Sequence, residues 1–103
     1  NFNLAGSSNY GLHLILKRKN KKLFKKVLKI LDINLIEYRI GSAGGGNQLR
    51  QPYLKKFKNK FNATKFYNTE HMHFYSLYIG NYPELSKSKI INLCKLLDNI
   101  KLN

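Results

Sequence analysis

Apolar and polar residues alternate with a period of two in three short segments of the chain. Residues 10–16 place apolar side chains on both faces of an extended segment, and residues 34–40 have a similar strand-like pattern. Residues 73–79 are rich in aromatic and branched side chains and run into a turn signal at 80–83. We therefore predict three strands, over 10–16, 34–40 and 73–79.

Two other segments repeat apolar residues at the three-and-four spacing of a helix. One runs from Asn20, a residue suited to an N-cap, to about Asp32. Its opposite face carries lysines, which we interpret either as a solvated surface or as one that follows phosphates. The other helix follows Ser86 as its cap, and its predicted buried stripe consists of Ile90, Ile91, Leu93, Cys94, Leu97 and Ile100.

This order of elements predicts an α+β fold: a small three-stranded, mostly antiparallel sheet with two main helices on one face. The first strand, helix and second strand should form a unit with a right-handed crossover. A length of 103 residues fits a single domain over 1–103. Because the only methionine is Met72 and the chain begins with Asn1, we expect a piece of a longer protein.

Cysteine content and hydropathy bear on the compartment. The single cysteine, Cys94, cannot form a disulfide within the chain, and we predict that it lies in the core. The sequence has no run of about 18 apolar residues that would span a membrane and no leader for export. We therefore expect a cytoplasmic location and no membrane partner.

The chain carries a large positive charge, which predicts that the domain attracts anions. Lysine and arginine number 19 and aspartate and glutamate 5, for a net charge of +14. Arginines are few (Arg18, Arg39 and Arg50), and lysine cannot form the bidentate fork, which argues against base-specific recognition. Residues 53–68 interleave rings with lysines, a pattern typical both of base stacking and of a short amphipathic helix.

Several enzyme classes lack support in the sequence. The five carboxylates (Asp32, Glu37, Glu70, Glu84 and Asp98) are scattered, with no pair or triad spacing. The glycines match neither a Walker loop nor the dinucleotide fingerprint. His71 and His73 would share one face of a strand, but the ligand set for a metal is incomplete. His13, alone in the first strand, is interpreted as a hydrogen-bonded structural histidine.

The most unusual stretch is the glycine-rich loop 41–53. Four of the seven glycines fall within 41–46, where the backbone must turn or approach a ligand closely. Asn47 and Gln48 offer amides, Arg50 suits a carboxylate or phosphate, and Pro52 stiffens the exit. A flexible connector is the alternative interpretation. Arg39, at the end of the preceding predicted strand, is positioned either to reach an anion or simply to lie on the surface.

The same loop carries a family resemblance. The run Gly46-Asn47-Gln48-Leu49-Arg50-Gln51-Pro52-Tyr53 follows Glu37-Tyr38-Arg39 and, earlier, Ser7-Ser8-x-Tyr10-Gly11-Leu12. This arrangement resembles the C-terminal small domain of the DegT/DnrJ family of pyridoxal-phosphate-dependent sugar aminotransferases. That family includes nucleotide-sugar dehydratases such as CDP-4-keto-6-deoxyglucose 3-dehydratase.

The resemblance implies a detached C-terminal domain, inactive alone, of an enzyme of deoxysugar or aminosugar biosynthesis for surface polysaccharide. The pyridoxal phosphate and the catalytic residues would belong to a missing N-terminal large domain, and the full-length enzyme would be a homodimer. The nucleotide-sugar substrate would meet Asn47, Gln48, Arg50, Gln51, Tyr53 and Arg39. The alternatives are a small basic α+β nucleic-acid-binding module and a plain interaction domain. Under the resemblance, nucleic acid would bind only non-specifically.

Overall fold

The computed structural model describes residues 5, 8–41, 46–57 and 60–100. Its sheet has three strands: β1 (Gly11–Ile15), β2 (Arg39–Ile40) and β3 (Ser76–Gly80). They lie in the order β1-β3-β2, and both outer strands are antiparallel to β3. β1 and β2 therefore run parallel to one another, with β3 between them. The predicted α+β fold with a small antiparallel sheet is confirmed.

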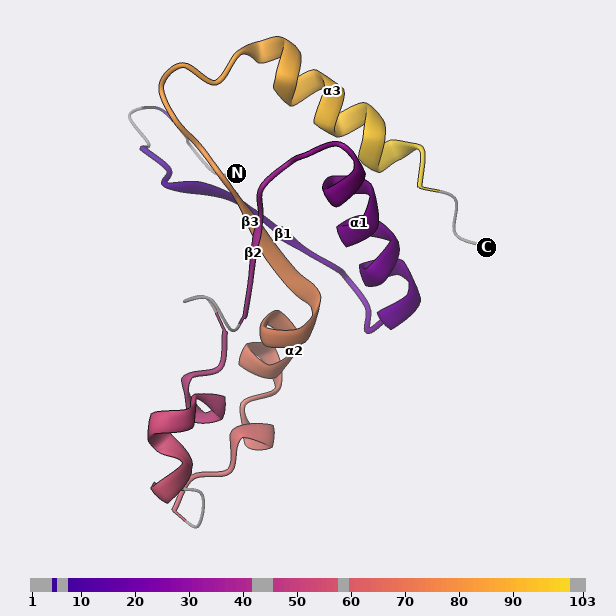
Figure 1. Ribbon diagram of the computed structural model, residues 1–103. Coiled ribbons are helices and arrows are strands. Elements are labelled where there is room, and N and C mark those ends of the chain that lie inside the picture. Colours follow the sequence, from indigo (N-terminus) through magenta and orange to yellow (C-terminus); the bar gives the residue numbers. More distant parts are fainter. Residues whose placement is uncertain (1–4, 6–7, 42–45, 58–59, 101–103) are drawn as a thin grey trace.

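Helices α1 (Lys21–Ile33) and α3 (Lys87–Asp98) cover one face of this sheet (Figure 1). Both begin as the sequence predicts. The Asn20 side chain accepts a hydrogen bond from the backbone N–H of Leu23 at 2.9 Å, and the Ser86 hydroxyl accepts one from Lys89 at 3.4 Å. Each cap satisfies one of the backbone donors that the first turn of a helix leaves without a partner.

The core lies between the sheet and the two helices. Val27, Leu31, Leu77 and Leu93 are buried, and Leu31 has no exposed surface. Partly buried neighbours pack against them, among them Leu14, Leu23, Phe24, Ile36, Tyr38, Ile79 and Leu97. Residues directly opposite in an antiparallel pair share a face of the sheet. The pair Leu14 and Leu77 therefore faces the helices, and the neighbouring pair His13 and Tyr78 faces away from them.

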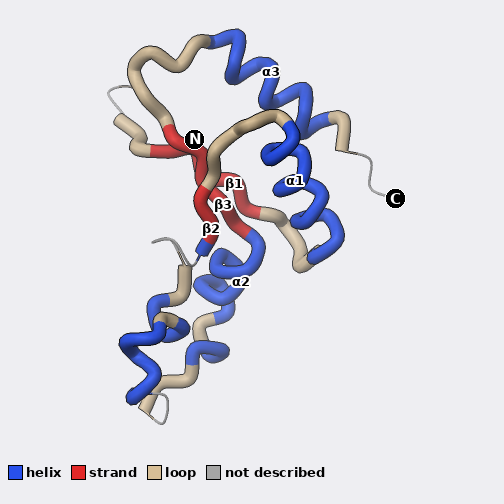
Figure 2. Tube along the Cα trace, in the orientation of Figure 1, coloured by secondary structure: helices blue, strands red, loops and turns tan. Residues whose placement is uncertain are grey.

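A second region projects from the sheet. Residues 46–57 and 60–75, which we call the helical lobe, contain the 3₁₀ turns η2 (Gln48–Arg50), η3 (Pro52–Phe57) and η4 (Ala63–Lys65) and the helix α2 (Tyr67–Tyr75). Figures 1 and 2 show the lobe extending away from α1 and α3, with α2 joined directly to β3. The radius of gyration is 15.9 Å, against about 13 Å for a compact chain of this size.

Two strand predictions are wrong in their bounds. Residues 73–75, predicted as the start of the third strand, are the last turn of α2. His71 and His73 therefore lie on a helix, where residues two apart do not face each other. The second strand, predicted over 34–40, is confined to Arg39–Ile40. Leu35 has a φ of 54°, in the left-handed region, which interrupts the extended backbone before β2.

The predicted burial of α3 is also wrong in part. Cys94 is exposed, as are Ile90 and Ile91. The residues of α3 and its C-terminal end that reach the core are Leu93, Leu97 and Ile100. This spacing of four and three residues forms one narrow stripe, and Cys94 lies about 100° around the helix from Leu93. Among the described residues, no helix combines the length and apolar character needed to cross a membrane.

Candidate functional site

The centre of the helical lobe is the carboxylate of Glu70, in the first turn of α2. Its side chain is 13% exposed, and Arg50 donates to it through two nitrogens: Nε to Oε1 at 2.7 Å and Nη2 to Oε2 at 2.6 Å. The Asn47 side-chain amide also donates to Oε1 at 2.7 Å. The hydrogen bond from Arg50, opposed by burial and assisted by Asn47, lowers the pKa of Glu70 below its usual value. The carboxylate is therefore held ionised.

Asn47 connects three parts of the lobe. Its side chain is buried, and the amide donates a second hydrogen bond to the backbone carbonyl of Ala63 at 3.1 Å. Its side-chain oxygen accepts from the N–H of Leu49 at 3.1 Å, and its own N–H donates to Nδ1 of His73 at 3.0 Å. Asn47 thus joins η2 to η4 and to α2.

His73 takes part in this arrangement as an acceptor. Burial is the main cause that lowers the pKa of His73 below its usual value, with a further contribution from the nearby Arg50 cation. Both effects favour the neutral imidazole, which is the form whose Nδ1 can accept the Asn47 N–H. The imidazole therefore also fixes the position at which the chain enters η2.

Two glycines of the glycine-rich loop pack against the same helix. A Cβ at Gly41 would overlap the backbone of His73, and a Cβ at Gly46 would overlap the His73 imidazole and the carbonyl of Gly41. These two glycines permit the chain to pass close to α2. Residues 42–45, which include Gly44 and Gly45, lie outside the described residues.

The structure separates the predicted substrate residues into three groups. Asn47 and Arg50 meet at Glu70, inside the lobe. Gln48 is exposed and accepts a hydrogen bond from the Tyr53 hydroxyl at 2.5 Å, and Gln51 between them is half-buried.

Arg39 forms the third group, because it lies on β2 rather than in the lobe. It donates to Glu37 at 3.2 Å, with 57% of its side chain exposed. Sequence reasoning did not identify Glu70 as the partner of Arg50. The available signal was an acidic residue in the first turn of a helix, where the helix dipole favours it, but that helix was not predicted.

The described residues do not fit pyridoxal phosphate. Such a site needs a lysine for the imine and a carboxylate at the pyridine nitrogen. Every described lysine is exposed, and Glu70, the least exposed carboxylate, is bound by Arg50. Within the same residues, no group of three His, Cys, Asp or Glu side chains is placed to hold a metal ion.

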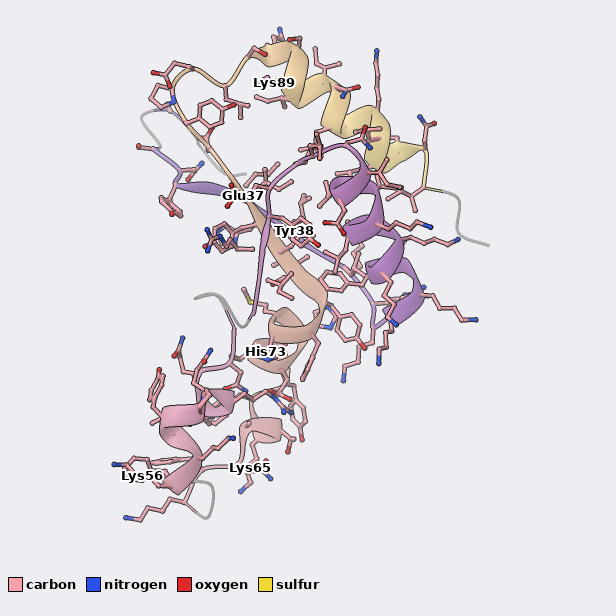
Figure 3. All side chains as sticks on the ribbon, viewed as in Figure 1. Glu37, Tyr38, Lys56, Lys65, His73 and Lys89 are labelled. Carbon is pink, nitrogen blue, oxygen red and sulfur yellow. The ribbon has the colours of Figure 1, made fainter. Side chains whose placement is uncertain are left out.

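Basic side chains dominate the surface. All described lysines and arginines are exposed. They are densest on two segments, the outer side of α1 (Lys21, Lys22, Lys25, Lys26 and Lys29) and the helical lobe (Lys55, Lys56, Lys60 and Lys65). Figure 3 shows Lys56 and Lys65 at the end of the lobe farthest from the sheet. Since the chain has only 5 carboxylates for 19 basic residues, most of this positive charge cannot be neutralised within the chain.

The open face of the sheet carries a row of rings and a cation. His13 on β1, Tyr78 on β3 and Arg39 on β2 are directly opposite one another across the three strands. The His13 and Tyr78 ring centroids are 5.4 Å apart, and the Tyr10 ring, from the bend before β1, lies 6.2 Å from that of Tyr78. Helices α1 and α3 pack on the opposite face; His13 and Arg39 are exposed, and Tyr78 is half-buried.

Comparisons of the chain with family models, with curated proteins and with solved structures give no match.

Proposed function

We propose that this chain binds nucleic acid, through contacts between its lysines and the phosphate backbone. The observation that carries the proposal is the exposure of every described basic side chain in a chain of net charge +14. A protein that neutralises phosphates with lysines gains affinity by releasing the counterions condensed on the nucleic acid. Binding of this kind needs no bidentate arginine and matches the lysine-rich composition.

The first contact surface is the outer side of α1. Lys21, Lys25 and Lys29 are each separated by four residues, which places them about 6 Å apart along the helix axis. The opposite side of α1 contributes Val27 and Leu31 to the core. This packing holds the helix in place, so that the lysines project from a fixed support rather than from a flexible tail.

The second contact surface is the helical lobe. Its lysines lie among exposed rings: Tyr53 is 64% exposed, Phe61 54% and Tyr67 79%. Rings next to cations are typical of surfaces that bind single strands, because every base offers a face for stacking. The Glu70 carboxylate does not oppose this charge, because Arg50 already neutralises it.

The salt dependence of binding tests the proposal. We expect a fluorescently labelled single-stranded RNA to bind at about 50 mM salt and to lose affinity linearly on a log–log plot as salt increases. The triple variant Lys21→Gln, Lys25→Gln, Lys29→Gln removes three charges from exposed helix positions. For three lost phosphate contacts, the slope should decrease by about 2.

A double variant on α3 provides the control and is compared with the double variant Lys21→Gln, Lys25→Gln on α1. Lys87→Gln, Lys95→Gln removes two charges from exposed positions of another helix. A larger loss of slope in the α1 variant than in the α3 variant supports the proposal. Absence of binding at low salt, or equal slopes for the wild type and the α1 variant, would contradict it.

A second candidate is the small domain of a sugar-modifying pyridoxal-phosphate enzyme. The exposed Gln48 and Tyr53, joined by a hydrogen bond, favour it because they offer polar groups to a neighbouring domain or substrate. Titration with CDP-, UDP- and dTDP-linked hexoses, followed by amide NMR, tests this candidate. Shifts confined to 48–53 would support it, and no shift at millimolar ligand would remove it.

A further inference from the structure

We infer that the open sheet face around Tyr78 is a stacking platform for an unpaired base of a single-stranded nucleic acid. The inference rests on the proposed function and adds the place and the kind of strand to it. We call the residues Tyr10, Gly11, His13, Arg39, Tyr78 and Gly80 the ring platform.

The ring platform combines aromatic surface with a cation. The side chains of His13, Tyr78 and Arg39 form one row across the sheet, and adjacent strands are about 4.8 Å apart. The rings of His13 and Tyr78 are tilted by 35°, and those of Tyr10 and Tyr78 by 51°. Tyr10 is 83% exposed, so its ring has a free side. A base that stacks here would leave its phosphate within reach of a guanidinium.

Two glycines make room beside the rings. Gly11 and Gly80 are directly opposite each other on the same face as Tyr78. A Cβ at Gly11 would lie 3.2 Å from a carbon of the Tyr78 ring and 3.0 Å from the carbonyl oxygen of Ile79, so the ring lies close over the glycine. A Cβ at Gly80 would meet nothing within 4 Å. No described residue therefore covers the surface next to Tyr78 at Gly80.

The platform continues into a groove. A cavity of about 690 Å³ adjoins the platform at the edge of β3. Tyr10, Arg39, Tyr78 and Gly80 line its platform side, and its helix side is largely apolar, with Ile36, Leu85, Ile90 and Leu93 among the lining residues. Its origin is the short β2, which pairs with β3 at Tyr78 and Leu77; within the described part of the chain, no strand pairs with that edge of β3 at Ile79 and Gly80. A volume of this size is within the range of pockets that hold small ligands, and it has room for a nucleotide.

Two basic side chains at the border of this partly apolar groove favour a nucleic acid over an apolar protein segment as the occupant, because a base can cover apolar surface while its phosphate meets the cations. Arg39 and Lys89 border the groove, and both are exposed. Among the described residues that line the groove, the opposing group is Glu37, which pairs with Arg39 at 3.2 Å while 82% of its side chain is exposed. An exposed ion pair contributes little stability, so Arg39 can exchange this partner for a phosphate. An apolar segment would supply no anion for Lys89.

A comparison of strands with and without bases tests the inference. A single strand of about 12 nucleotides matches the site sizes of such surfaces. Oligothymidylate and an abasic strand of the same length carry the same phosphates, so a difference in affinity reports contacts to bases. We expect the wild type to bind oligothymidylate about tenfold more tightly than the abasic strand.

Single substitutions identify the surface that causes the preference for bases. Tyr78→Leu removes the central ring, and Tyr10→Ala removes a ring whose exposure gives it little part in folding. Both should reduce the preference for bases several-fold while retaining affinity for the abasic strand. Tyr67→Ala removes a similarly exposed ring from the helical lobe and measures how much of the preference arises there, which should be less than at the ring platform. Ile33→Ala, at an exposed position outside both surfaces, is the control and should retain the whole preference. Circular dichroism verifies that each variant is folded.

The outcomes separate this inference from the proposed function. If neither strand binds at low salt, both are wrong. If both strands bind with equal affinity, the proposed binding through lysines is retained, and the inference that the ring platform stacks a base is wrong. If Tyr67→Ala abolishes the preference and Tyr10→Ala does not, stacking occurs on the lobe instead, and the inference is overturned.

Discussion

The α/β layer (residues 8–41 and 76–100) and the helical lobe are stabilised in opposite ways. In the layer, the buried side chains of Val27, Leu31, Leu77 and Leu93 form an apolar core. In the lobe, the one buried side chain among the described residues is the polar Asn47. Asn47 donates hydrogen bonds to Glu70 and to His73, and Arg50 also donates to Glu70. The lobe is thus organised around ions and amides rather than around apolar contact.

Size explains the difference. A segment of about 30 residues buries too little surface for an apolar core of its own. Directional hydrogen bonds to an ionised group can hold a small region in one conformation. Their net contribution to the free energy of folding is limited, because water solvates the same groups in the unfolded chain. We therefore expect the lobe to open before the layer unfolds, and substitutions in the two regions to have different consequences.

The largest effect is expected from the core of the layer. Leu31→Ala removes a side chain with no exposed surface and should destabilise the protein by about 2–5 kcal/mol. Urea denaturation should show that the layer unfolds at a lower urea concentration and that the lobe does not stay folded after it, because the lobe depends on β3 for its attachment. Ile33→Ala, at an exposed position of the same helix, is the control. Unfolding of the layer without the lobe would invalidate the comparison.

A smaller and local effect is expected from Glu70→Ala. The change leaves Arg50 and Asn47 without their acceptor and should cost about 1.5–3 kcal/mol. Hydrogen exchange should become faster in η2 and α2 and remain slow in β1 and the middle of β3. Glu84→Ala, which removes an exposed carboxylate from the layer, should change neither. Equal loss of protection in both regions would show that the lobe is not a separate unit.

The smallest effect is a pH dependence confined to the lobe. The pKa of His73 lies below its usual 6.5, so the unfolded chain binds this proton first, and stability decreases as the pH falls below 6.5. The pKa of Glu70 lies below its usual 4.5, so its contribution is complete above 4.5 and is lost as the pH falls further. The Asn47 amide should therefore exchange progressively faster on acidification, relative to amides of β1. A constant ratio between pH 7 and pH 4 would contradict this expectation.

Local chemistry made part of the fold predictable. Asn20 and Ser86 cap α1 and α3 as the sequence indicates, because a cap depends on residues within one turn. α2 was missed because the ring-rich residues Phe74 and Tyr75 resemble a strand, and residues 73–79 were assigned to one. Leucine rarely adopts a left-handed φ, so the sequence gives no indication that the backbone turns at Leu35. The predicted second strand is therefore longer than β2.

The sites depend on contacts that local patterns do not reveal. Arg50 and Glu70 are 20 residues apart, and their pairing requires α2 to be in place. The row of His13, Tyr78 and Arg39 requires the register of three strands from distant parts of the chain. The sequence predicted the residue types, lysine, arginine and aromatic ring, but not which of them would be brought together.

α2 ends at Tyr75 and β3 begins at Ser76, with no residue between them. One extra residue at this junction would turn every side chain of β3 to the other side of the sheet. Tyr78 would then point towards α1, and Leu77 would point into solvent. Insertions and deletions of a single residue should therefore be selected against at this junction. In related sequences, we expect the number of residues between α2 and β3 to vary less than the identities of the residues at the junction.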